Sequence, residues 1–118
     1  MQFSQKEKEA LREFICKSEF IHDSKILNVV CDGKSICMSF ENLFVGKNFE
    51  IVFQDVTFFG TLNVENWGND EGISILTLDD DDFYKKIDNR IDGMPFVIEH
   101  FSGRKTYIVC DKIQFCYE

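Results

Sequence analysis

A turn dipeptide between two β-type runs is the feature that most constrains the fold of this chain. Asp32-Gly33 separates residues 25–31 from residues 34–40, and such a dipeptide accepts the positive φ angles of a tight hairpin turn. Folding the chain there predicts an antiparallel pair with Cys31 opposite Lys34 and Lys25 opposite Phe40. One face of this pair is apolar and is expected to be buried. It consists of Leu27, Val29, Cys31, Ile36, Met38 and Phe40.

The remaining segments indicate one helix and several further strands. Ser4 and Glu7 have capping-box spacing, and residues 4–18 predict a helix whose apolar face holds Ala10, Leu11, Phe14 and Ile15. Residues 49–54 alternate as a strand does, and the change of parity after Asp55 predicts a bend or bulge in a strand that continues to residue 60. Other strands are expected near residues 61–64, 73–78, 96–101, 105–110 and 113–117.

These elements predict a single α+β, mainly β domain over residues 1–118. Because the connections are short, antiparallel neighbours are favoured. We expect an N-terminal helix packed on an antiparallel sheet, or on a sandwich or partly open barrel, of six to eight short strands. Residues 81–91 allow either a short helix or a loop. The chain has no apolar run long enough to cross a membrane.

Cysteine usage favours a cytoplasmic protein. The five cysteines are odd in number and contain no Cys-x-x-Cys pair, and the polar N-terminus does not resemble a signal peptide. The predicted hairpin puts Cys31 and Cys37 on opposite faces, where they cannot form a disulfide. We expect all five to be free thiols acting as small buried apolar residues in a reducing compartment. They are Cys16, Cys31, Cys37, Cys110 and Cys116.

The negative charge is concentrated in the middle of the chain. The net charge is −8, and residues 48–99 hold twelve acidic against three basic residues, whereas residues 1–47 hold seven of each. Such a field repels nucleic acid and anionic membranes and attracts cations or a basic protein. The sequence therefore argues against a nucleic-acid or membrane partner and favours a basic protein.

Within this acidic segment, one run of aspartates and one tryptophan are candidates for partner contacts. Residues 79–82 are consecutive aspartates without the spaced ligands of a calcium loop, so they predict a helix-capping cluster or a surface for a basic partner. Trp67 has acidic neighbours and could anchor an interface or cover the end of a sheet. The predicted partner-binding residues are Glu65, Trp67, Asp70, Glu71, Asp79, Asp80, Asp81, Asp82 and Tyr84.

The sequence gives less support to enzymatic catalysis than to partner binding. An Asp can orient a His for general base catalysis, but adjacent His22 and Asp23 would face opposite sides of a strand. Phosphate-binding loops, nucleophile elbows and zinc-ligand spacings are absent from the sequence. We therefore predict no catalytic residue, metal or cofactor. The alternatives are a domain for a small molecule or cation, or an enzyme, using His22, Asp23 or His100, and a module that dimerises weakly through a strand edge.

Two short motifs suggest a family. Phe20-x-His22-Asp23-Ser24-x-Ile26, the alternating hairpin and Ile51-x-Phe53-x-x-Val56 resemble small β-rich bacterial proteins, over about residues 20–56. Some of those are immunity proteins of polymorphic or contact-dependent toxin systems. The resemblance implies that the chain blocks a cognate toxin in the cytosol without chemistry of its own. An acidic inhibitor is suited to a nuclease-type toxin, whose active site is basic.

Overall fold

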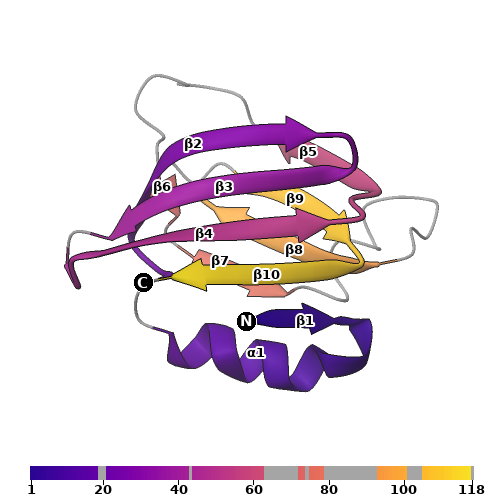
Figure 1. Ribbon diagram of the computed structural model, residues 1–118, viewed down its shortest axis with the longest axis horizontal. Helices are drawn as coiled ribbons and strands as arrows, with labels where there is room; N and C mark the ends of the chain where they lie inside the picture. The colour runs from indigo at the N-terminus through magenta and orange to yellow at the C-terminus, as the bar shows by residue number, and fades with distance from the viewer. Residues whose placement is uncertain are drawn as a thin grey trace.

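The computed structural model describes residues 1–18, 21–42, 44–62, 72–73, 75–78, 93–100 and 105–117 (Figure 1). These residues form ten strands and one α-helix, which a short 3-10 turn precedes. The expected mainly β fold with an N-terminal helix is confirmed. The number of strands exceeds the expected six to eight because two of them, β1 and β6, have only three and two residues. Strands this short leave no alternating pattern in a sequence.

The strands form two antiparallel sheets that face each other (Figure 1). The first sheet has the order β1 (Gln2–Ser4), β10 (Lys112–Tyr117), β4 (Lys47–Gln54), β3 (Ser35–Asn42), β2 (Ser24–Asp32) and β6 (Gly72–Ile73). The second has the order β5 (Phe58–Leu62), β9 (Lys105–Cys110), β8 (Met94–Glu99) and β7 (Ile75–Leu78). Every pairing within the two sheets is antiparallel.

The chain passes between the sheets four times, after β4, β5, β6 and β9. After β4 ends at Gln54, Asp55 has a φ of +56°, and the next strand, β5, belongs to the second sheet. Residues 55–57 therefore do not continue the strand as expected, although the predicted bend is present. The passage from β6 to β7 is short, because β6 pairs with β2 in the first sheet and β7 pairs with β8 in the second.

The first hairpin forms as expected, but its register differs by two residues. Asp32 pairs with Ser35 and Cys31 with Ile36, so Gly33 and Lys34 are the central residues of the turn. Gly33 has a φ of +61°, and Gly with positive φ at the first central position fits a type II′ turn. A shift of two residues keeps side chains on their predicted faces, because the side-chain period of a strand is two.

Strand β2 is more exposed than the sequence predicts. Leu27, Val29 and Cys31 are exposed, so their predicted burial is wrong, whereas the β3 residues of the same predicted face are buried. The register of β2 shifts between Ile26 and Asn28, which leaves Leu27 as an extra residue. Among the described residues, β6 borders β2 only at its beginning, and the rest of β2 forms an edge.

The core lies between the two sheets and is rich in phenylalanine. The alternation expected in residues 49–54 is confirmed, because Phe49, Ile51 and Phe53 are all buried. The ring of Phe53 meets that of Phe96 on the second sheet edge-on, with 5.8 Å between the ring centroids. Aromatic pairs prefer such arrangements, and this pair joins the two layers.

The helix covers the edge of the sandwich that β1 and β7 form. It spans Lys8–Lys17 (α1) and follows a 3-10 turn at Gln5–Glu7 (η1), so it begins later than expected. The backbone N–H of Ser4 donates to Glu7 at 3.3 Å, as the predicted capping interaction requires. Leu11 and Ile15 are buried, but Ala10 is exposed, contrary to the prediction. No helix in the described part of the chain is both long and apolar enough to cross a membrane.

Candidate functional site

The predicted partner-binding residues all belong to one segment between β5 and β8, and all lie outside the described residues. The structure describes how this segment is attached. It leaves the second sheet after β5, contributes β6 to the first sheet and β7 to the second, and returns at Gly93 before β8. The nine residues are Glu65, Trp67, Asp70, Glu71, Asp79, Asp80, Asp81, Asp82 and Tyr84.

The residues of the alternative, histidine-based site have separate local partners. His22 Nε2 lies 3.3 Å from the carbonyl oxygen of Ile15 in α1. His100 is buried, and its Nε2 lies 2.7 Å from the hydroxyl of Thr106 on β9. Asp23 is exposed, with a φ of +60°. Groups of three or more His, Cys, Asp or Glu side chains able to hold a metal are not found among the described residues.

The described residues form a groove on the outer face of the first sheet. Its volume is about 390 Å³, which is within the range of small-ligand sites, about 300–1,000 Å³. Its apolar lining consists of Leu27, Phe40, Phe49 and Tyr117. Its polar lining consists of Ser39, Asn48, Glu50 and Cys116.

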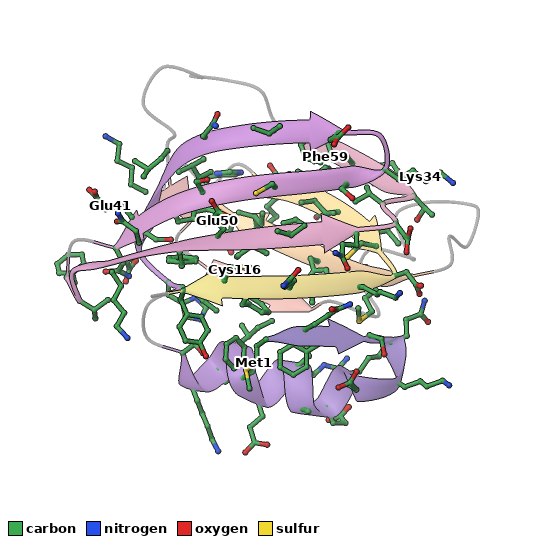
Figure 2. The ribbon with its side chains drawn as sticks, viewed as in Figure 1. Met1, Lys34, Glu41, Glu50, Phe59 and Cys116 are labelled. Atoms are coloured by element: carbon green, nitrogen blue, oxygen red, sulfur yellow. The ribbon has the colours of Figure 1, made fainter. Side chains whose placement is uncertain are left out.

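Three side chains on three strands form a row across this groove. The register places Ser39 of β3 opposite Glu50 of β4, and Glu50 opposite Cys116 of β10. Directly opposite residues in antiparallel strands share one face of a sheet, and Figure 2 shows Glu50 and Cys116 on the outer face. Of the lining residues in the described part of the chain, only Glu50 is acidic or basic.

The thiol beside Glu50 is a weak hydrogen-bond partner for its carboxylate. Cys37 Sγ lies 3.9 Å from a carboxylate oxygen of Glu50. Burial raises the pKa of the Cys37 thiol, and the nearby Glu50 and Cys116 raise it further. A thiol that remains protonated is only a weak donor, so this contact does not neutralise the carboxylate.

Exposed apolar side chains lie in the groove lining and on the turn between β3 and β4. Leu27 and Tyr117 are 52% and 45% exposed, and Phe44 on the turn between β3 and β4 is 87% exposed. Buried Asn42 holds this turn, because its side-chain oxygen accepts the backbone N–H groups of Phe44 at 3.0 Å and Val45 at 3.3 Å. Apolar side chains exposed together often mark a protein-binding surface.

The cysteines are free, as expected, but most of them are not buried. Cys16 and Cys31 are exposed, Cys37 and Cys116 are half-buried, and only Cys110 is buried. Burial, with smaller contributions from Asp111 and Asp55, raises the pKa of the Cys110 thiol to about 12. The expectation of five buried thiols is therefore wrong, because four of them lie on the helix surface, on an edge strand or on the outer face of a sheet.

Comparisons of this chain with protein-family models, with curated proteins and with solved structures find no match.

Proposed function

We propose that this protein is an acidic binding protein that acts as an immunity protein in the bacterial cytoplasm. It would neutralise a basic toxin domain of the nuclease type by occupying the toxin's active site. The observation that carries this proposal is the distribution of charge. Residues 48–99 hold twelve acidic and three basic residues, whereas the first 47 residues are electrically balanced.

The way in which the acidic segment joins the fold supports this role. Nine of the acidic residues lie between β5 and β8, in a segment that contributes a strand to each sheet. In the proposed role, the sandwich supports this strongly acidic segment. Such a region steers a basic partner during diffusion and raises the rate of association.

Neutralising the aspartate run tests the proposed function. We expect the change of residues 79–82 from Asp to Asn to slow association with a cognate basic toxin domain by about tenfold or more at low salt. Dissociation should change less, and the difference from the unmodified protein should shrink as salt screens the charges. Stopped-flow kinetics over a salt series would measure these effects.

The matched control removes acidic charge from the scaffold instead. Glu9 and Glu13 lie on the exposed side of α1, where they pair with Arg12 and Lys17. Changing both to Gln should leave association nearly unchanged. Equal slowing by the control and by the aspartate variant would show that only net charge matters. Undiminished association of the aspartate variant would exclude the run as the contact.

The edge of β2 favours a second role, which is weak self-association. Beyond Lys25, the pairing of β2 among the described residues is with β3 alone, and both Val29 and Val30 are exposed there. An unpaired edge with apolar side chains can accept another strand.

If β2 mediates self-association, sedimentation velocity should detect a dimer at high protein concentration. Val30→Lys should raise the dissociation constant of this dimer at least tenfold, because it places like charges close together along the paired edges. A strictly monomeric protein at millimolar concentration would contradict this role.

A further inference from the structure

We propose that the groove on the outer face of the first sheet receives an arginine side chain of the basic partner, with Glu50 as its counter-charge. This inference rests on the proposed function and adds a second, structurally defined contact to it. The aspartate run would attract the partner over distance, whereas the groove would hold one of its side chains.

The charge of the groove selects a cation. Among the described lining residues, Glu50 alone is acidic or basic, and the described contact of its carboxylate is the Cys37 thiol at 3.9 Å. The attraction between opposite charges is stronger beside a low-dielectric wall than in open water. The groove supplies an apolar part of such a wall through Leu27.

The other lining residues favour arginine over lysine. A guanidinium group is planar and has five N–H donors, so it needs several acceptors in addition to one carboxylate. The hydroxyl of Ser39 and the amide oxygen of Asn48 lie in the same lining as Glu50. The apolar stem of arginine suits the remaining surface.

The position of the groove suits a contact with a folded protein. It lies on the outer face of the sheet, across β3, β4 and β10, where Figure 2 shows Glu50 and Cys116. The turn that presents Phe44 joins β3 to β4. Interfaces commonly combine an apolar anchor with a charged residue in a concave site. Phe44 and Glu50 would supply these two parts.

A titration with a minimal probe tests the groove directly. We would titrate the isotopically labelled protein with N-acetyl-arginine amide and follow its backbone amides by NMR. We expect saturable shift changes at Ser39, Glu50 and Cys116, with a dissociation constant in the millimolar range. The corresponding citrulline amide, which has the same shape without the charge, should bind at least tenfold more weakly.

Two variants make the test specific. Glu50→Gln should abolish the saturable shifts, and since Glu50 is exposed on the outer face, its spectrum should remain that of a folded protein. Glu9→Gln removes the same charge from the helix surface and should bind the arginine probe as the unmodified protein does. Unchanged binding by Glu50→Gln, or shifts scattered over the surface, would overturn the inference.

The same variants test the guanidinium site and the proposed function independently of each other. If the aspartate variant loses fast association with the toxin domain while Glu50→Gln binds the toxin normally, the groove inference is wrong and the immunity role stands. If the unmodified protein does not bind the toxin but binds the arginine probe through Glu50, the groove remains a guanidinium site and the immunity role is wrong.

Discussion

Phe53→Ala is expected to lower the free energy of unfolding by about 3–5 kcal/mol. The side chain is fully buried on β4, and its ring contacts Phe96 across the two sheets. Removing the ring leaves a cavity between two layers whose strands are held by their own hydrogen bonds, so the layers cannot collapse to fill it. Guanidinium denaturation would measure the loss as a lower midpoint at an unchanged slope.

Phe44→Ala is the matched control, because it makes the same chemical change at a side chain that is 87% exposed. Substitutions at such positions usually change stability by no more than about 0.5 kcal/mol. If the two variants lost similar stability, the ring of Phe53 would not lie between the sheets as described. The pair therefore tests the layered architecture as well as one residue.

The sequence correctly predicts which side chains of β4 are buried. Phe49, Ile51 and Phe53 alternate with polar residues, and all three face the core. The same reasoning is wrong for Leu27, Val29 and Cys31, which have the same pattern but are exposed. Alternation predicts which side chains share one face of a strand. Whether that face is buried depends on the layer that packs against it, and a sequence pattern does not locate that layer.

The hairpin register shows the limit of turn signals. Asp32-Gly33 and Gly33-Lys34 both place Gly33 at a central position, and either dipeptide could close a two-residue turn. The structure uses Gly33-Lys34, which fits because Gly takes the positive φ and Lys34 does not need one. The turn residues therefore predict the hairpin correctly, but they do not decide between two registers that differ by two residues.

The groove could not have been predicted from the sequence. Ser39, Glu50 and Cys116 come from three strands, and the alignment of the third strand with the first two depends on pairing between distant parts of the chain. In its own strand, Glu50 has the position of an ordinary solvent-facing residue. Its importance becomes visible only when the register places it between a hydroxyl and a thiol.

The acidic segment, unlike the groove, can be recognised from the sequence. Its charge can be counted directly from the sequence, and this count carries the proposed function. The structure adds the places at which the segment joins the sandwich, namely β5, β6, β7 and the beginning of β8. Gly93 directly precedes β8, and its geometry leads to the second large prediction.

Gly93→Ala is expected to lower the free energy of unfolding by about 3 kcal/mol, from backbone strain and overpacking together. Gly93 has a φ of +135°, and a Cβ there would lie 2.7 Å from Val109 Cγ1 and 3.0 Å from the carbonyl oxygen of Cys110. The valine could move a little, but the carbonyl belongs to β9 and is held in the sheet. Thermal and chemical denaturation would both measure the loss.

Gly46→Ala separates the two causes of this loss. Gly46 also has a positive φ, +66°, but a Cβ there would meet nothing within 4 Å, so only the backbone cost of about 1–2 kcal/mol remains. A larger loss for Gly93→Ala would show that the chain enters β8 in close contact with β9. Since the acidic segment ends at this point, that contact fixes one end of the proposed working surface to the sandwich. Equal losses would instead mean that the entry to β8 can relax, and that the segment is held less firmly.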